Sequence, residues 1–224
     1  MIRLATDNRL VKIFESACML FINSGYPETK MKDIAQSAGI SVGSLYDLFD
    51  SKKSLLDFIF ISTLDKDNLT ISHDFPIHEV SSSSLASKTK STYEIYTKSF
   101  DSKLLSNDKS YSLKSLILDL FDIFEIYGRY FLILEKNPTI DITLIKLYEK
   151  YRKTLYKNIS IYLDNNNSLR KTSDSHYDSM MIVDLVFWWS THKKYDSFEN
   201  SKNKYNMDTM SKTIIDALTN GYAK

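Results

Sequence analysis

The chain has 224 residues, of which 43% are hydrophobic and 25% are charged, so it can bury a sizeable core and still present a charged surface. Its five glycines and three prolines are too few for the turns of a many-stranded sheet, and long helices are therefore favoured. A formal net charge of +1 excludes a protein that is basic throughout, so binding of nucleic acid must be argued from the local placement of charges.

The number of cysteines and the absence of long apolar runs indicate the cellular compartment of the protein. Cys18 is the only cysteine, which excludes an intrachain disulfide framework and is typical of a reducing compartment. It lies among apolar residues at helical spacing, where we expect a small buried side chain. No apolar run is long enough to cross a bilayer, and the start of the chain lacks the apolar core of a secretory signal. We therefore expect a cytoplasmic protein with no membrane partner.

Short helices with glycine-containing connections are expected at the start of the chain. Apolar residues recur at steps of three and four before Gly25, which follows where a left-handed helix cap favours a residue without a side chain. Gly39 lies in a tight turn, and Ser41 is of the type that caps a following helix. The helices expected here span residues 7–24, 31–37 and 42–49, with a fourth running from 52 to between 63 and 68.

The rest of the chain predicts a helical body. Residues 70–110 hold many Ser and Lys and few aliphatic side chains, which indicates a connection with one weak helix at about 85–105. Apolar stripes at helical spacing then return, and they predict helices near 116–137, 144–165, 176–195 and 203–222. The expected fold class is all-α, with about nine helices arranged as an N-terminal three-helix head and a C-terminal body.

The head carries the chemistry of a helix-turn-helix. Two short helices joined by a turn at Gly39 can place the second helix in a major groove. Gly43 lies near the start of that helix, where Gly costs about 1 kcal/mol relative to Ala, and close approach to a sugar-phosphate backbone would explain it. Lys52 and Lys53 lie in the first turn of the next helix, which is the unfavourable end of the dipole for a cation. A DNA phosphate at the start of that helix would face both lysines and the exposed backbone amides. The Tyr46 hydroxyl can reach a second phosphate.

Each of these features also has a purely structural explanation. Any short helical hairpin can show the same spacing, so spacing alone does not decide for DNA. Taken singly, Tyr46 can be a residue at the edge of a core and Lys52 a solvated surface cation. The case for DNA binding therefore depends on the features occurring together.

Residues 10–56 hold a set of short motifs in order and without a gap. They are Ile13-Phe14-Glu15-Ser16-Ala17, Leu20-Phe21, Gly25-Tyr26, Thr29, Asp33-Ile34-Ala35, Ala38-Gly39-Ile40-Ser41, Gly43, Leu45-Tyr46, Phe49, Ser51-Lys52 and Leu55-Leu56. Together they resemble the N-terminal signature of the TetR (tetracycline repressor)/AcrR-type family of transcriptional regulators. The resemblance covers about a quarter of the chain and is specific as an ensemble.

The resemblance implies roles for individual residues of the head. Thr29 is expected to contact a phosphate or to cap the second helix, residues 41–44 to face the groove, and Phe49 to be core. Tyr46 and Lys52 are expected to bind phosphates. The DNA-binding residues expected on this basis are Thr29, Lys30, Ser41, Val42, Gly43, Ser44, Tyr46 and Lys52.

The resemblance also implies a division of the chain and an assembly. We expect a DNA-binding domain over residues 1–56, linked through the fourth helix at about 52–68, and an effector-binding and dimerisation domain over 69–224. One helix-turn-helix grips a single face of a major groove, so we expect a homodimer that binds a (pseudo)palindromic operator in double-stranded DNA. The last two helices, near 176–195 and 203–222, are the expected interface, although their apolar stripes are equally consistent with monomer core.

Two departures from the family pattern raise an alternative. Leu48 replaces the polar or aromatic residue that usually precedes Phe49, and Asp47 is an acid that a phosphate would repel. The first 60 residues hold seven Lys or Arg against seven Asp or Glu, so the head is neutral. The alternative function is a TetR-like protein-interaction module or coactivator that no longer binds DNA.

The body holds candidates for a ligand cavity but none for catalysis. Aromatic residues suit an apolar or aromatic effector, although ordinary core packing explains most of them equally well. His73 and His78 lie on either side of Pro76 without a third histidine at metal-binding spacing, so we predict no metal and no cofactor. No phosphate-binding loop or local nucleophile-base motif is present, and we expect no enzyme. The candidate effector-binding residues are Tyr127, Phe131, Tyr151, Asp184 and Trp188.

These expectations converge on one function. The sequence predicts a dimeric, DNA-binding transcriptional regulator, a repressor that an unknown small-molecule effector releases from its operator. The mechanism expected is a shift between two conformations of the dimer, in which effector binding moves the fourth helix and changes the separation of the two recognition helices.

Overall fold

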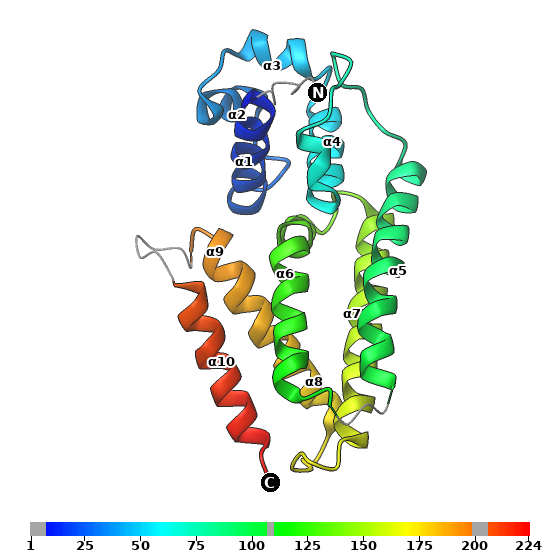
Figure 1. Cartoon of the computed structure of the whole chain (residues 1–224). Helices are drawn as coiled ribbons and strands as arrows, with labels where there is room; N and C mark the ends of the chain where they lie inside the picture. Colours follow the sequence, from blue (N-terminus) through cyan, green and yellow to red (C-terminus); the bar gives the residue numbers. More distant parts are fainter. Residues whose placement is uncertain (1–7, 107–109, 199–205) are drawn as a thin grey trace, which may run out of the picture. The chain divides into compact units, whose positions relative to one another are not determined.

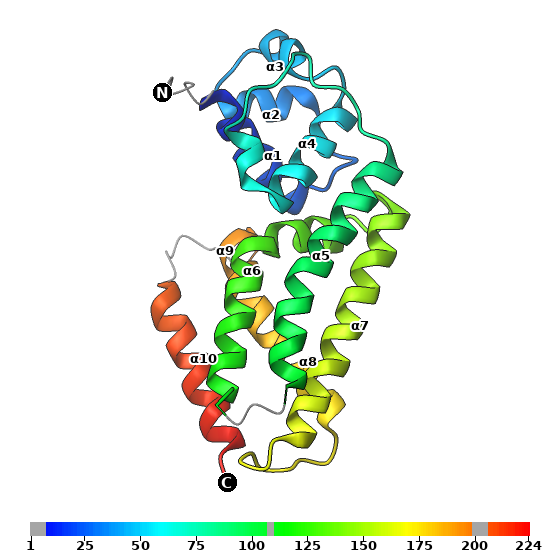
Figure 2. The ribbon, with the colours of Figure 1, turned by 45° about the vertical axis from the view of Figure 1, so that its right-hand side comes forward.

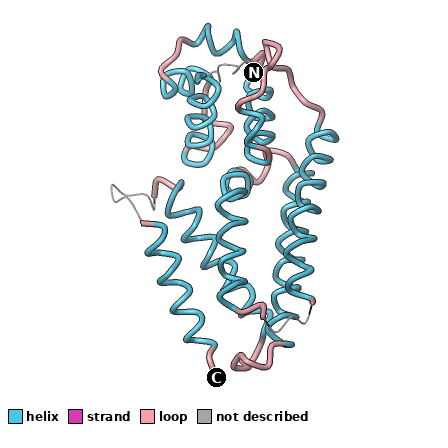
Figure 3. Tube along the Cα trace, viewed as in Figure 1, coloured by secondary structure: helices cyan, strands magenta, loops and turns pink. Residues whose placement is uncertain are grey.

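The computed structural model describes residues 8–106, 110–198 and 206–224. All regular structure in these ranges is helical apart from two isolated β-bridges, which confirms the all-α fold expected from the sequence (Figure 3). The chain divides into two compact units. Unit 1 comprises the residues up to Thr89 together with Arg129–Ile145, and unit 2 comprises Lys90–Gly128 and Lys146–Lys224. The functional division expected at residues 56–69 stays a prediction.

Unit 1 contains the four helices expected at the start of the chain, and its core is aliphatic and aromatic. Phe21, Ile34 and Leu45 are fully buried, and Cys18 is buried among them, as expected. Burial raises the pKa of the Cys18 thiol to about 12. The elements, labelled in Figure 1, are α1 (Asn8–Asn23), α2 (Met31–Ala38), α3 (Val42–Leu48), α4 (Lys52–Leu64) and the 3₁₀-helix η1 (Lys66–Leu69).

The connections in unit 1 form as their residue types predict. Gly25 and Gly39 adopt φ of +85° and +71°, in the left-handed region that favours glycine. Ser41 caps α3 by accepting a hydrogen bond from the Ser44 amide at 3.0 Å, and Ser51 caps α4 by accepting one from the Ser54 amide at 2.9 Å. The glycine and serine positions therefore set where each short helix begins and ends.

One buried amide side chain joins two distant parts of unit 1. The Oδ1 atom of Asn137 accepts from the Tyr26 backbone amide at 2.6 Å. Its Nδ2 atom donates to the carbonyl oxygens of Phe21 at 2.9 Å and Ile133 at 2.8 Å. Because Asn137 is 4% exposed, these bonds satisfy polar groups that water does not reach. They hold the α1–α2 turn against the residues that follow α6.

The remaining elements extend from unit 1 into unit 2 or lie within unit 2. In unit 2, α5 and α7 run side by side, as Figures 1 and 2 show. The rings of Tyr93 and Tyr151 are 4.9 Å apart there, and Asn158 donates to Asp101 at 2.7 Å. The elements are α5 (Ser82–Leu105), α6 (Leu113–Lys136), α7 (Ile142–Asn165), α8 (Ser175–Phe187), the π-helix η2 (Trp188–His192), α9 (Lys193–Tyr195) and α10 (Met207–Tyr222).

The observed helices differ from the expected ones in three places. The third helix ends at Leu48, because Phe49 adopts an extended backbone with φ of −137°. The helix expected at about 85–105 begins earlier, at Ser82, and is a full element of 24 residues. The helix expected over 176–195 changes to π-helical bonding at Trp188–His192.

The π-helix packs closely against α6 at Gly128. A Cβ atom at position 128 would lie 2.3 Å from Thr191 Oγ1 and 3.0 Å from its Cγ2 atom. Thr191 is fully buried, so its side chain has no room to move away. A glycine is required here by close approach of the two segments rather than by its backbone angles.

We therefore predict that Gly128→Ala lowers the free energy of unfolding by about 1–3 kcal/mol, because overpacking at this contact outweighs the better helix propensity of Ala. Chemical denaturation of the purified protein measures the change. The second substitution in Gly128→Ala/Thr191→Ala should recover part of the loss, because it removes the clashing atoms. Gly221→Ala, where nothing lies within 4 Å of the added atom, should not destabilise. An unchanged denaturation midpoint for Gly128→Ala would contradict this packing.

Candidate nucleic-acid interface

Helix α3 presents the residues expected to face DNA on its exposed side. Val42 and Tyr46 are 39% and 50% exposed, and Ser41 and Gly43 are exposed with them. On the opposite side, Leu45 is 0% exposed. The helix therefore has one side fixed in the core and one side open to a partner.

The hydroxyl groups at the start of α3 are oriented by each other. Ser41 Oγ donates to Ser44 Oγ at 2.9 Å while it accepts from the Ser44 amide. The hydrogen of the Ser44 hydroxyl is not used by this pair, so Ser44 can donate to a base edge or a phosphate oxygen. Leu48, which departs from the family pattern, is 2% exposed and belongs to the core, whereas Asp47 is exposed beside Tyr46.

Thr29 and Lys30 lie just before α2, and Thr29 does not cap that helix. Thr29 is 2% exposed, and its hydroxyl donates to the Gly25 carbonyl at 2.7 Å. The N-cap of α2 is Lys30, whose backbone amide donates to the Asp33 carboxylate at 3.0 Å. The expectation that Thr29 caps this helix is therefore wrong, because its side chain points back into the α1–α2 turn. The Lys30 side chain is exposed.

Lys52 is used as an internal clamp. Its ammonium donates to the carbonyl oxygens of Tyr26 at 2.9 Å, Thr29 at 3.0 Å and Pro27 at 3.4 Å. It also lies 4.3 Å from the centre of the Tyr26 ring. An ammonium has three N–H donors, and all three are directed to the α1–α2 turn. The sequence analysis placed Lys52 at the start of α4 but missed this role, because the partner carbonyls come from a turn more than twenty residues earlier.

The neighbouring cation is also engaged within the protein. Lys53 pairs with Asp57, whose side chain is fully buried and also accepts from the Val80 amide at 3.1 Å. Burial raises the pKa of the Asp57 carboxyl, and the bond from Lys53 opposes that rise. The positive charge of Lys53 is therefore largely balanced at the start of α4.

A segment that the sequence analysis treated as a connection lies against the α3–α4 turn. The Ile77 amide donates to the Leu48 carbonyl at 2.8 Å, and the Ile77 carbonyl accepts from the Asp50 amide at 3.3 Å. These bonds make a parallel bridge between Ile77 and Phe49. We call residues 71–80 the strap. Its backbone satisfies a carbonyl at the end of α3, which would otherwise lack a helical partner.

Two strap side chains also contact the α3–α4 turn. The Nδ1 atom of His78 lies 2.7 Å from Asp50 Oδ2, and this contact, with a bond from Ser54, holds the pKa of Asp50 below its usual value. Ser51 Oγ donates to Glu79 Oε1 at 2.7 Å. His73 and His78 each bond within unit 1, and the described part of the chain holds no group of three His, Cys, Asp or Glu side chains suited to a metal.

Two of the candidate effector residues are buried members of a tyrosine cluster in unit 2 that also includes Tyr93 and the exposed Tyr96. Tyr127 and Tyr151 are 3% and 8% exposed, and their rings pack against those of Tyr96 and Tyr93 on α5. Burial raises the pKa of the Tyr151 hydroxyl. The structure therefore brings tyrosines of three helices together.

The other three candidates do not join this cluster. Phe131 belongs to unit 1 and is 1% exposed. Asp184 and Trp188 lie on the exposed side of α8 and η2. Asp184 accepts hydrogen bonds from Arg152 at 2.9 Å and Tyr156 at 2.7 Å. Burial raises the pKa of Tyr156 to about 12, and the bond to Asp184 adds to the rise.

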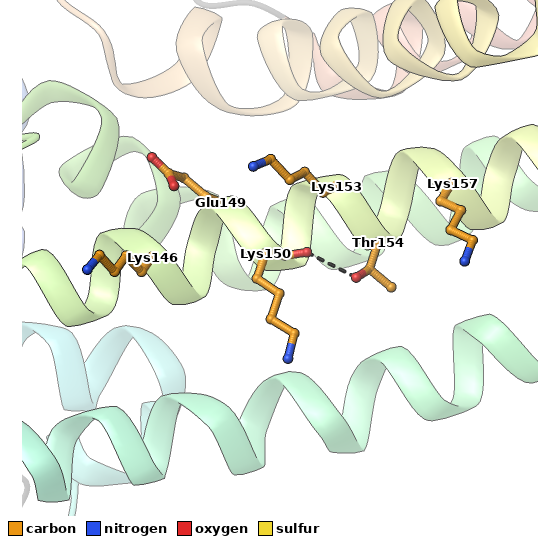
Figure 4. Close-up of a pocket in the computed structure, with 6 residues that line it drawn as sticks. All are labelled: Lys146, Glu149, Lys150, Lys153, Thr154 and Lys157. Atoms are coloured by element: carbon orange, nitrogen blue, oxygen red, sulfur yellow. Dashed lines mark hydrogen bonds between the residues drawn. The ribbon is translucent and has the colours of Figure 1, made fainter.

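Two hollows of unit 2 differ in chemistry. A groove of about 140 Å³ between α5 and α6 has apolar walls made by Tyr96, Phe100, Ile123 and Ile126, with Lys103 bonded to Asp119 at 2.9 Å at its rim. A larger, open hollow of about 400 Å³ follows one side of α7, where the side chains spread outward rather than converge (Figure 4). That open hollow is lined by Lys146, Glu149, Lys150, Lys153, Thr154 and Lys157.

The head and the chain as a whole are similar to known sequences. A model of the family described as "Bacterial regulatory proteins, tetR family" matches residues 13–58. The chain is 26% identical over 204 residues to the Staphylococcus aureus protein named "Biofilm operon icaADBC HTH-type negative transcriptional regulator IcaR", covering 89% of this chain and 94% of that protein. It is 44% identical over 59 residues to the Rhodococcus jostii "HTH-type transcriptional repressor KstR2". These residues cover 26% of this chain and 29% of that protein.

Solved structures share the fold. The ketosteroid transcriptional regulator KstR2 of Mycobacterium tuberculosis superimposes with a TM-score of 0.60 at 16% identity, over the whole of both chains. AibR, solved with isovaleryl coenzyme A and operator DNA, gives a TM-score of 0.52 at 14% identity and covers 93% of this chain and 97% of its own. Among the described residues, no helix is long and apolar enough to span a membrane.

We predict that Lys52→Met lowers the free energy of unfolding by about 1–2 kcal/mol, because the α1–α2 turn loses charge-assisted hydrogen bonds that methionine cannot replace. Thermal and chemical denaturation measure the effect. Lys12→Met is the matched control, because Lys12 is exposed on α1 and should change stability by less than about 0.5 kcal/mol. Equal effects of the two substitutions would show that the clamp contributes nothing.

Proposed function

We propose that the chain is a TetR-type DNA-binding transcriptional regulator and that it acts as a dimeric repressor, which a small-molecule effector releases from its operator. The single observation that carries the proposal is the outward face of α3, with Val42 and Tyr46 exposed and Leu45 and Leu48 in the core. A recognition helix must present such a face to enter a major groove. We place the protein in the cytoplasm, with the DNA that it binds.

We assign base contacts to the start of α3 and phosphate contacts to the residues around it. Ser41, Val42, Gly43 and Ser44 meet base edges, with Ser44 as the hydrogen-bond donor. Lys30 and Tyr46 contact phosphates, because both side chains are exposed, Tyr46 on the outward side of α3 and Lys30 at the N-cap of α2. In this proposal, Thr29 and Lys52 act indirectly, by holding the turn from which Lys30 projects. The N-terminal amides of α4 take a further phosphate.

A second copy of the chain is the partner that the surface of unit 2 favours. Tyr177, Met181 and Trp188 are 68%, 49% and 41% exposed, and their spacing of four and seven residues puts them on one side of α8 and η2. Apolar side chains aligned in this way are typical of a helix that packs against another. We propose that α8 and α10 form the dimer interface, which gives the two-fold symmetry that a palindromic operator requires.

The effector site is proposed in unit 2, at the tyrosine cluster and the adjoining groove of α5 and α6. Phe100 and Ile123 provide apolar walls, and Tyr127 packs against Tyr96, which lines the groove. These surfaces suit a small molecule with an apolar or aromatic part. AibR was solved with isovaleryl coenzyme A, and IcaR is named a negative regulator, so effector binding and repression both occur among the proteins this chain resembles.

One alternative has a specific observation in its favour. Asp47 is exposed on the outward side of α3, and the charges of Lys52 and Lys53 are engaged within the protein. A TetR-like module that binds a protein instead of DNA would have such a head. The salt dependence of DNA binding distinguishes the two functions, because phosphate contacts make affinity fall steeply with salt.

We predict that Lys30→Ala weakens binding to every DNA sequence and makes the slope of log affinity against log salt shallower by about one unit. Tyr46→Phe should also weaken binding to all sequences, because it removes a phosphate contact, and Ser44→Ala should change base preference instead. Fluorescence anisotropy with fragments selected from genomic DNA measures all three, with Lys157→Ala on the exposed side of α7 as the control. Wild-type affinity and slope for both Lys30→Ala and Tyr46→Phe would contradict the proposed docking. Failure of the wild type to retain genomic DNA at low salt would favour the protein-interaction module.

A further inference from the structure

The strap is fixed at the point where the DNA backbone is proposed to meet α4. Its Ile77 is bonded on both sides of Phe49, to the Leu48 carbonyl and the Asp50 amide. Its last residue, Val80, donates to the buried Asp57 carboxylate at 3.1 Å. Strap residues between these anchors are therefore held close to the N-terminus of α4 in every molecule that keeps this fold.

Glu79 places a carboxylate at that N-terminus. Its Oε1 atom accepts from the hydroxyl of Ser51, the N-cap of α4, at 2.7 Å. The start of a helix carries a partial positive charge and unpaired backbone amides, which attract a carboxylate or a phosphate in the same way. The strap thus supplies from within the chain the kind of group that DNA would bring.

Within the part of the chain that the structure describes, both lysines in the first turn of α4 are already engaged. The Lys52 ammonium is directed to three carbonyl oxygens of the α1–α2 turn, and Lys53 pairs with Asp57. His78, the strap residue that precedes Glu79, contacts Asp50 rather than Glu79. A phosphate that approaches Ser51 would therefore meet the Glu79 carboxylate with little compensation, and like charges at short distance repel.

We infer that Glu79 limits the affinity of this protein for DNA by occupying a phosphate position at the N-terminus of α4, from which the DNA backbone must displace it. The inference rests on the proposed function and names a residue of the binding surface that the sequence motif does not include. Glu79 is exposed and holds Ser51 through a single side-chain bond, so displacement needs no rearrangement of the core.

The test compares the full-length protein with Glu79→Gln and Glu79→Lys on a mixed-sequence 30-base-pair duplex at several salt concentrations, because phosphate contacts do not depend on sequence. Glutamine keeps the size of the side chain and can still accept from Ser51. We expect Glu79→Gln to bind about five- to tenfold more tightly at low salt, because an approaching phosphate no longer meets a carboxylate. Glu79→Lys should bind more tightly still and should steepen the slope against log salt by about 0.9, because it adds a cation that can neutralise a phosphate.

The matched control is Asp74→Asn, which removes the same charge from an exposed strap residue. It should raise affinity by less than about twofold, because dissolved salt screens the interaction between the DNA and a charge that does not touch the phosphate position. An equal rise for Asp74→Asn and Glu79→Gln would overturn the inference. A misfolded variant would lose affinity, so a gain cannot arise from damage.

The remaining outcomes separate the inference from the proposed function. If the wild type binds the duplex and Glu79→Gln binds no more tightly, Glu79 is only a tether of the strap, and the inference fails while DNA binding stands. If neither protein binds at low salt, the proposed function fails and the inference with it.

Discussion

The burial of Leu45 and Leu48 decides which side of α3 can meet a partner. These two leucines are three residues apart, so they occupy one side of a short helix and leave Val42, Gly43 and Tyr46 on the other. Seven residues of helix have little stability of their own. The core contacts, the Ser41 cap and the strap backbone together hold α3 in the orientation on which DNA recognition depends.

The charges of the head are arranged more for structure than for attraction to DNA. Lys52 stabilises the α1–α2 turn, Lys53 neutralises Asp57, and Glu79 lies at the start of α4. Lys30, by contrast, is exposed at the start of α2, and its ammonium makes no hydrogen bond or ion pair among the described contacts. We therefore expect this head to bind DNA mainly through the shape and hydrogen bonds of α3, with a modest electrostatic contribution, so that sequence-specific contacts outweigh non-specific ones.

Local signals in the sequence were sufficient for the helices of the head and for the outward face of α3. Gly25, Gly39 and Ser41 act within a few residues of themselves, so their types alone predict the turns and the cap. The clamp at Lys52 and the strap could not be predicted in this way, because their partners lie about 23 to 28 residues away. The strap also lacks any periodic pattern, and its order comes from backbone bonds that any residue type except proline could make.

The placement of the candidate effector residues was predicted less well, because it also depends on contacts between distant parts of the chain. Aromatic residues at helical spacing predict burial correctly for Tyr127, Phe131 and Tyr151, but they do not tell which helices pack together. Asp184 and Trp188 have similar spacing and lie on an exposed side. Only the tertiary arrangement separates residues that surround the tyrosine cluster from those that form an outer surface.

The most direct test of the account is cross-linking from the exposed side of α3. The native Cys18 is buried, so a photoreactive maleimide label attached to Val42→Cys would react at that position alone. With bound genomic fragments, we expect cross-links from residue 42 to bases in a major groove, and none from the same label at Lys157→Cys on the exposed side of α7. DNA that binds without any cross-link to residue 42 would contradict the assignment of α3 as the recognition helix.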